Sequence, residues 1–487
     1  MIGRSSIYGR RLSSVTSSAM TSRPPNSRFD RSLVDGPIGS AVWKLAWPTV
    51  LQNVIGGLQG MIDHAMVGHY VSYAANAAIG VSLQVFLVVM VFLSSMFSGM
   101  GVLVARFTGA GDERGVQHAA SQAFVVALAL SIGVLAPVGY LAAPFLLALV
   151  NAAPEVQTLA LPYLRIMFVF SFGMMMFFML GGGLRSAGDA RTPLKLGLVL
   201  TALNIVFNVI FIRGLGPIPA FGTAGAAIGT AIASGLVAIY AVNRLFSGEW
   251  VLDFRGMSWK PDWTVIRALF RFGLPTGLQG IAMNIAGVLL LRFIGSLEQS
   301  AESQAAYAVG YTELFSLVTW TSVGLMGAAA AIAGQNLGAG KPERSVRAVQ
   351  VASRYGLTIA VVVGLLFLTI PRQLLGLFGM DQPEVLQIGE QLLAYLSVSG
   401  LFITVALTYT GGLQGTGDTR SPLYISLISQ FAIPIGMLTV IQLSRPLVAT
   451  DVWLAIVIGH ATRCLLSVLR FRQGKWRSIE LGVEPAR

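Results

Sequence analysis

Charged residues are scarce in this 487-residue chain. Asp, Glu, Lys and Arg make up 11% of it, whereas soluble proteins usually contain about 25%. Hydrophobic residues make up 54% of the chain, and its mean hydropathy is +0.71. This composition excludes an ordinary soluble protein and predicts an integral membrane protein.

Cysteine and histidine are also rare. The single Cys464 can neither close an internal disulfide nor supply a thiolate cluster, and the four histidines form no HExxH-type pair. No phosphate-cradling Walker loop is present. We therefore expect no enzymatic activity and no bound cofactor. The net charge of +12 is explained more simply by membrane orientation than by a nucleic-acid partner.

One stretch of the sequence is repeated. Residues 182–193 (GGLRSAGDARTP) recur as residues 411–422 (GGLQGTGDTRSP), at an offset of 229. The same offset relates Gly109-Ala110-Gly111 to Gly338-Ala339-Gly340. Internal duplication at a fixed offset indicates a fold built from two similar halves.

Charge-poor stretches recur after Trp43, each long enough for a helix that crosses a hydrocarbon core of about 30 Å. We predict an all-α protein with twelve transmembrane helices. They lie near residues 41–66, 76–104, 118–142, 161–183, 194–212, 221–245, 267–294, 305–333, 346–370, 389–412, 422–443 and 450–470.

The distribution of basic residues supports this count. If both termini are cytoplasmic, 28 of the 33 Lys and Arg residues lie on the inner side, as the positive-inside rule requires. An even number of helices per repeat gives both halves the same orientation. We therefore expect two six-helix bundles related by a pseudo-two-fold axis along the membrane normal. The predicted parts are a disordered basic tail (1–40), a first bundle (41–245), a cytoplasmic linker (246–266), a second bundle (267–471) and a short cytoplasmic tail (472–487).

Residues 1–40 are rich in Arg and Ser and lack the continuous apolar core of a secretory signal. We interpret them as a cytoplasmic tail. Two alternatives stay open, namely an organelle transit peptide of similar composition and a start of the natural chain at Met20.

The two repeated loops are predicted to be tight cytoplasmic turns. Glycine accepts the left-handed conformation that ends a helix, and Thr192 or Ser421 is then expected to cap the next helix ahead of a proline. The simplest role for the charged loop residues is turn structure, and the alternative is a gate on the inner side. These residues are Asp189, Arg191, Asp418 and Arg420.

Polar residues inside the predicted spans are candidates for function. A carboxylate there costs about 2.5 to 3.5 kcal/mol on insertion scales, and Asp63 shares one helix face with Gln52 and Gln59. Asn204 and Asn208 lie one turn apart on the fifth helix. If these two faces meet, they form an oxygen-rich cluster for a proton or a small hard cation. The alternatives are interhelical hydrogen bonding for the asparagines and a headgroup position for Asp63.

Glu313 is a second candidate carboxylate, near the outer end of its helix. Its counterpart in the first half is Gln84, so this charge occurs in one repeat only. Its alternative role is a carboxylate that reaches the interface. The methionines at 174–176 are expected to serve in packing or face lipid, although flexible thioethers also suit promiscuous apolar binding.

The chain resembles a bacterial MATE (multidrug and toxic compound extrusion) transporter from about Trp43 onward. The matching segments are 61–68 (MIDHAMVG), 163–166 (YLRI), 334–343 (GQNLGAGKPE) and the two repeated loops. The resemblance implies a V-shaped pair of bundles in the cell (inner) membrane. It also implies alternating access and the export of amphipathic, often cationic compounds in exchange for protons or sodium ions.

The resemblance assigns roles to several residues. Asp63 matches the first-helix acid that binds the coupling ion, Asn204 and Asn208 match the fifth-helix pair, and Thr230 matches a threonine on the sixth helix. Glu313 matches an eighth-helix glutamate of one bacterial branch. We expect no metal beyond a sodium ion.

The chain also departs from the family pattern. Met283 stands where many members carry a glutamate, and Ile403 and Thr404 occupy the region of a tenth-helix aspartate found in some sodium-coupled members. The coupling site is therefore expected in the first half. Polar residues expected around the cavity are Gln52, Gln59, Gln84, Gln279 and Asn284.

The leading hypothesis is a monomeric antiporter whose partners are an amphipathic substrate and the lipid bilayer. The alternative is a flippase for lipid-linked precursors or polysaccharides of the same superfamily, which usually has a basic cavity. The absence of a Lys or Arg cluster within the predicted helices argues against a flippase. The coupling ion and the physiological substrate stay open.

Overall fold

The computed structural model describes residues 29–150 and 152–483. Within these residues the protein is helical, with one isolated antiparallel bridge between Leu215 and Ile218. The helices of the first half are α1 (Ser32–Asp35), α2 (Ile38–Tyr70), α3 (Tyr73–Ser94), α4 (Met96–Ala110), α5 (Glu113–Leu128), η1 (Ala129–Leu135), α6 (Ala136–Leu149), α7 (Pro154–Val169), α8 (Phe172–Ser186), α9 (Arg191–Arg213) and α10 (Thr223–Ser247). Those of the second half are α11 (Trp263–Gly295), α12 (Ser300–Tyr307), η2 (Ala308–Leu314), α13 (Ser316–Gly338), α14 (Pro342–Thr369), α15 (Pro371–Gly376), α16 (Pro383–Thr416), α17 (Arg420–Ser426), η3 (Leu427–Ala432), α18 (Ile433–Ser444), α19 (Ala449–Arg472) and η4 (Lys475–Ser478).

The helices are long enough for a polytopic membrane protein. Ten helical segments of the described residues are long and apolar enough to cross a membrane, and α7 with α8 forms a further span bent by 55°. α2 has 33 residues and is also long enough, although Gln52, Asn53 and Gln59 lower its hydropathy. The all-helical, multi-span fold expected from the sequence is confirmed.

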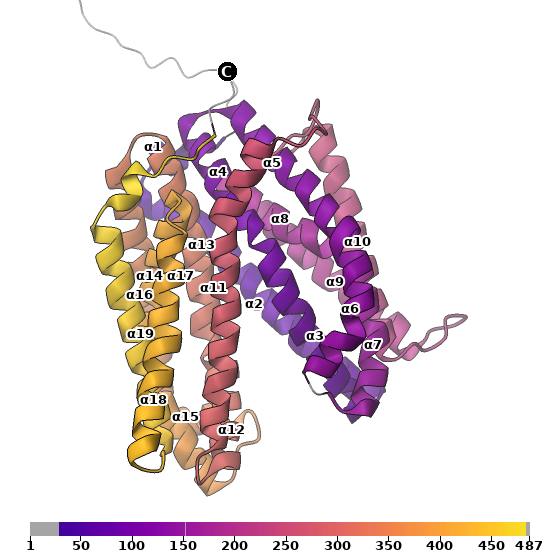
Figure 1. Ribbon diagram of the computed structural model, residues 1–487, viewed down its shortest axis with the longest axis vertical. Coiled ribbons are helices and arrows are strands. Elements are labelled where there is room, and N and C mark those ends of the chain that lie inside the picture. The colour runs from indigo at the N-terminus through magenta and orange to yellow at the C-terminus, as the bar shows by residue number, and fades with distance from the viewer. Residues whose placement is uncertain (1–28, 151, 484–487) are drawn as a thin grey trace, which may run out of the picture.

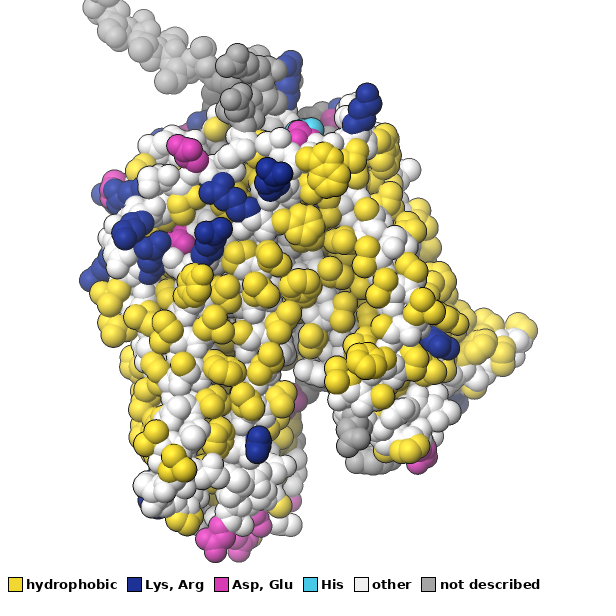
Figure 2. Space-filling view, in the orientation of Figure 1, with side chains coloured by type: hydrophobic (Ala, Val, Ile, Leu, Met, Phe, Trp, Pro, Cys, Tyr) yellow, Lys and Arg dark blue, Asp and Glu magenta, His cyan; other side chains and the backbone are white. Residues whose placement is uncertain are grey.

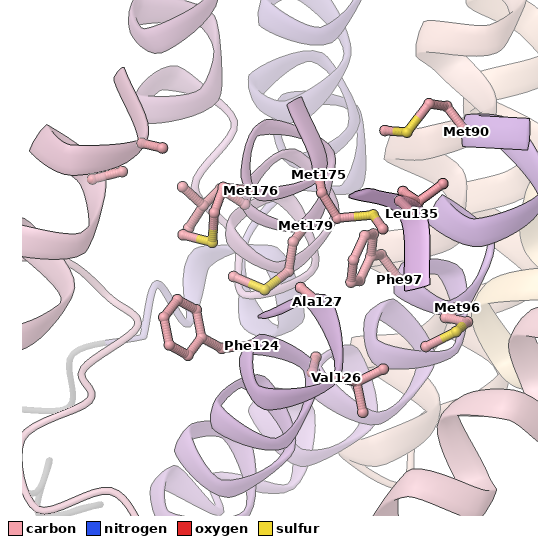
Figure 3. Close-up of a cluster of buried hydrophobic side chains, with 14 of the residues drawn as sticks. Met90, Met96, Phe97, Phe124, Val126, Ala127, Leu135, Met175, Met176 and Met179 are labelled. Carbon is pink, nitrogen blue, oxygen red and sulfur yellow. The ribbon is translucent and has the colours of Figure 1, made fainter. Parts of the chain in front are cut away.

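The two halves of the chain form the arms of a V, which meet at one end and separate at the other (Figure 1). One hydrophobic core lies within the first arm and a second within the other arm. Figure 3 shows the methionine-rich part of the first core. Met175, Met176 and Met179 are fully buried there, so these methionines serve in packing, while Met174 faces the cavity described below.

Two long helices connect the arms. The first part of α2 packs against α13, where Val42 and Leu45 join a third core with Leu325. The first part of α11 packs against α3 and α4, with Leu269 in the core of the first arm, whereas Ile294 near its end lies in the second core. Each of these helices therefore begins in one arm and ends in the other.

A crossing of α4 and α13 closes the V at the end where the arms meet. A Cβ atom on Gly109 would stand 1.8 Å from the backbone oxygen of Gln335, and one on Gly338 would stand 2.0 Å from that of Arg106. The same offset of 229 relates both pairs. Gln335 also donates a hydrogen bond across the junction to the backbone oxygen of Ser186, at 2.7 Å. Only glycine permits helices to approach this closely, so we call this crossing the glycine seal.

Lys and Arg gather near the sealed end, whereas Asp and Glu occur at the far end of the second arm (Figure 2). Residues 29–40, which we expected in a disordered tail, pack against this sealed end instead. Leu33 of α1 is fully buried, and its backbone oxygen accepts a hydrogen bond from Asn336. Residues 1–28 lie outside the described part of the chain. On the C-terminal side, Trp476 of η4 is 1% exposed, so the segment expected as a second tail is also packed through η4.

The repeated loops are tight turns built around their aspartates. Gly188 and Gly417 both adopt φ of +101°, as expected for glycines that end a helix. The predicted caps were wrong, because α9 and α17 begin at Arg191 and Arg420, one residue before Thr192 and Ser421. The preceding aspartate accepts the free backbone N–H groups instead.

Candidate functional site

A cavity of about 750 Å³ lies between the two arms. Its aromatic and methionine walls suit a flat apolar molecule. They comprise Phe86, Phe97, Tyr163, Met167, Met174, Phe177, Phe178, Trp320 and Met326. Both halves of the chain contribute, since Trp320 and Met326 belong to α13 and Gln414 to α16. The cavity therefore changes shape whenever the arms move relative to each other.

A chain of hydrogen bonds joins three helices of the first arm at the cavity wall. Asn208 donates to Oδ1 of Asp63 at 2.8 Å and to Oδ1 of Asn204 at 3.2 Å. Asn204 in turn donates to Oγ1 of Thr230 at 2.9 Å. The two asparagines are fully buried, and Asp63 is half-buried with an edge on the cavity. The structure thus brings together the four residues predicted as the cation site.

Local sequence explains how this cluster forms. Asn204 and Asn208 share a face of α9 because they lie one helical turn apart. α10 approaches that face closely because Gly229 has no side chain; a Cβ there would stand 2.2 Å from Oδ1 of Asn208. Gly229 supports the cluster and was not predicted. The sequence feature that could have indicated it is the Gly229-Thr230 pair, which follows the Asn-x-x-x-Asn helix in the chain.

The cluster can hold a small hard cation or a proton. It offers carboxylate, amide and hydroxyl oxygens, which are the ligands that such ions prefer. Oδ1 of Asn208 is buried and has no hydrogen-bond partner within the described residues. A buried unpaired acceptor is costly, and an incoming cation would satisfy it. The donor set therefore fits a sodium ion, and the carboxylate fits a proton.

The remaining predicted polar residues divide into three groups. Gln52 and Gln59 line the cavity, and Gln59 accepts a hydrogen bond from Thr201 at 2.7 Å. Gln279 is buried behind the wall, where it accepts from the cavity residue Gln414 at 3.2 Å. Gln84 and Asn284 are exposed residues outside the cavity lining of the described chain.

The structure does not bring Glu313 to the cluster. This residue is half-buried in η2 of the second arm, and it is not among the described residues that line the cavity. The two candidate carboxylates therefore do not form one site.

The loop residues occupy structural positions. Asp189 accepts from the backbone of Arg191 and Thr192, each at 3.0 Å. Asp418 is 5% exposed and forms an ion pair with Arg470. The side chains of Arg191 and Arg420 are exposed. This arrangement agrees with the turn interpretation, and the loops flank the glycine seal.

One charged cavity residue was not predicted. Arg185, counted from sequence among the basic residues of a cytoplasmic loop, lies in the last turn of α8 and lines the cavity. Its position in the Gly-Gly-Leu-Arg stretch, three residues before Gly188, was the available signal. Arg185 and Asp63 are the two charged residues that line the cavity within the described chain.

Comparison with known proteins identifies the family. The MatE family model matches the chain twice, over residues 48–210 and 275–438. The chain is similar to the probable multidrug resistance protein NorM of Thermotoga maritima, with 29% identity over 437 residues, 89% of this chain and 92% of that protein. It is 24% identical over 437 residues to the multidrug resistance protein MdtK of Pectobacterium atrosepticum, covering 88% of this chain and 94% of MdtK.

Solved structures agree with this fold. An outward-facing multidrug resistance MATE family transporter of the MOP superfamily has a TM-score of 0.84 and 22% identity, covering 92% of this chain and 98% of that one. The two matched segments begin at Pro48 and Pro275, on the two helices that connect the arms. The chain therefore belongs to the MatE family of membrane transporters.

Proposed function

We propose that this chain is a secondary active antiporter that exports amphipathic compounds in exchange for a proton or a sodium ion. The observation that carries the proposal is the placement of Asp63, whose carboxylate meets both the cavity and the amide cluster of α9. A single group with both contacts can hold a cation or face a cationic substrate. Competition for one carboxylate is the simplest way to couple the two movements.

One of the two helices that connect the arms, α2, can link cation binding to a conformational change. α2 holds Asp63 against α9 of the first arm, while its beginning packs on α13 of the second arm. Cation binding at Asp63 neutralises a carboxylate whose charge is penalised by burial. It also changes the contacts between α2 and α9. Because α2 reaches both arms, a shift at one end favours a different angle of the V, which is alternating access.

The cavity supports an amphipathic substrate. Its aromatic walls accept flat apolar bodies through stacking, and the cationic centre expected of the substrate would face Asp63. The relatives named as multidrug resistance proteins agree with a broad substrate range. The basic character of the sealed end supports an orientation with that end toward the cytoplasm of a cell inner membrane, both termini included.

A lipid-linked precursor flippase is the alternative. Such a protein would be expected to present several cations to its substrate, whereas Arg185 is the one basic residue that lines the cavity in the described part of the chain. We therefore prefer the antiporter.

Transport in proteoliposomes tests the proposal. The purified chain should drive accumulation of a fluorescent cationic dye when a proton gradient or a sodium gradient is imposed separately, and Asp63→Asn should abolish that accumulation. Asp189→Asn serves as a matched control, since it exchanges an acid at a turn outside the cavity lining. Gradient-driven transport that survives in Asp63→Asn would remove this carboxylate from the mechanism.

A further inference from the structure

Arg185 carries a charge that the described protein does not neutralise. Its guanidinium forms no ion pair or hydrogen bond with any described residue, and its Nε atom is buried without a partner. By contrast, the half-buried Arg470 forms an ion pair with Asp418. Arg463 is a second buried arginine whose Nε atom has no partner among the described residues, but it does not line the cavity. A desolvated unpaired cation is costly, which makes an external partner favourable.

The cavity that Arg185 lines, with a volume of about 750 Å³, leaves room for such a partner. Nη1 of Arg185 lies 3.1 Å from the place that a Cβ atom on Gly327 would occupy. Gly327 belongs to α13, so the guanidinium of the first arm faces a bare backbone of the second. The position related to Arg185 by the offset of 229 is Gln414, a neutral amide that donates to Gln279 at 3.2 Å. The two positions related by the repeat thus differ, since one holds an unsatisfied cation and the other a hydrogen-bonded amide.

Guanidinium chemistry defines the partner. A planar guanidinium presents five donors in a fork that matches the two oxygens of a carboxylate. The surrounding walls are aromatic, with Phe97, Phe177 and Trp320 among the lining residues. The ligand that satisfies both features is an apolar aromatic body with a carboxylate attached.

We propose that Arg185 binds the carboxylate of the transported compound, so that the cavity selects amphipathic zwitterions over simple cations. This inference rests on the proposed function and specifies its substrate class. Asp63 faces the cationic group and Arg185 the anionic group, so the two cavity charges match a zwitterion of zero net charge. A cation that binds Asp63 then weakens one of the two attachments, which promotes release of the compound.

Two dyes with the same chromophore test the proposal. Tetramethylrhodamine carries a free carboxylate, and its methyl ester is a simple cation. Binding of each dye to the purified full-length chain is measured by fluorescence anisotropy, and transport of each is measured in proteoliposomes. The variants are Arg185→Gln, which copies the neutral amide of the other repeat, Arg185→Lys, and the exposed loop control Arg191→Gln.

The ratio of the two dissociation constants is the readout. The wild type should favour the free carboxylate, and Arg185→Gln should lower that preference at least about tenfold, as expected for loss of a charge-assisted hydrogen bond. Arg185→Lys should restore part of it, and Arg191→Gln should match the wild type. If the ratio of the two dissociation constants is unchanged in Arg185→Gln, the assignment is overturned. This outcome includes the case in which Arg185 binds a lipid phosphate and not the carboxylate of the dye.

Binding and transport separate this inference from the function on which it rests. Carboxylate-selective binding without gradient-driven transport supports the role of Arg185 and overturns the antiporter. Transport of both dyes with equal affinity in the wild type supports the antiporter and overturns the role of Arg185. Failure to bind either dye overturns both.

Discussion

Replacing Gly109 with alanine should open the sealed end of the V. The added Cβ would stand 1.8 Å from the backbone oxygen of Gln335, so α4 and α13 must separate by roughly 1.5 Å to restore a normal contact. Overpacking of this kind costs about 1 to 3 kcal/mol, and the cost applies only while the seal is closed. The equilibrium between sealed and unsealed states should therefore shift by about 5- to 150-fold.

Cysteine accessibility measures this shift. In a Cys464→Ser background, Ser186→Cys places a thiol on the cavity lining beside the seal. A membrane-impermeant maleimide applied from the sealed side should label it faster in Gly109→Ala than in the parent chain. Gly287→Ala is the matched control, because a Cβ there would meet nothing within 4 Å. Equal labelling rates in the parent and Gly109→Ala would refute the idea that the glycine seal closes the cavity.

Two further predictions concern the cation cluster and the linker. Asn204→Ala should reduce ion-driven dye uptake about tenfold, the effect of losing one hydrogen bond in a charged cluster, because Asn204 donates to Thr230. Glu313→Gln changes a residue away from the cavity and should reduce uptake less. The reverse order of effects would place the cation site in the second arm. Asp262→Ala should cost about 1 kcal/mol of stability at pH 7, because the hydrogen bond with His118 and the capped backbone of α11 hold the pKa of this carboxyl below its usual value. That contribution is complete above the unfolded-state pKa of about 4 and is lost as the pH falls through the folded-state pKa. Thermal unfolding of both proteins in detergent checks it, and a difference that persists unchanged at low pH contradicts it.

The cluster could be predicted because each of its parts is local in sequence. Asp63 stood out as a carboxylate within an apolar span, and the spacing of Asn204 and Asn208 fixed a common face. Their meeting across α2 and α9 was a hypothesis until the structure placed Asn208 2.8 Å from Asp63. The repeat of the glycine loops likewise indicated two similar halves.

Other features depend on packing that no local pattern encodes. Arg185 was assigned to a cytoplasmic loop because the predicted helix ends at residue 183, yet α8 continues to Ser186 and Arg185 lines the cavity from its last turn. Leu33 was expected in a disordered tail because residues 1–40 are rich in Arg and Ser, although it packs in an apolar site next to α13. Thr192 has the chemistry of a cap, but Asp189 lies closer to the first free N–H groups.

Cation release on substrate binding tests the central claim most directly. The purified protein is loaded with the coupling ion, dye is added, and released protons are followed with a pH indicator or released sodium with a radioactive tracer. We predict about one cation released for each dye bound in the wild type and none in Asp63→Asn. Equal release from Asp63→Asn would contradict the assignment of the coupling site to this carboxylate and its asparagine neighbours.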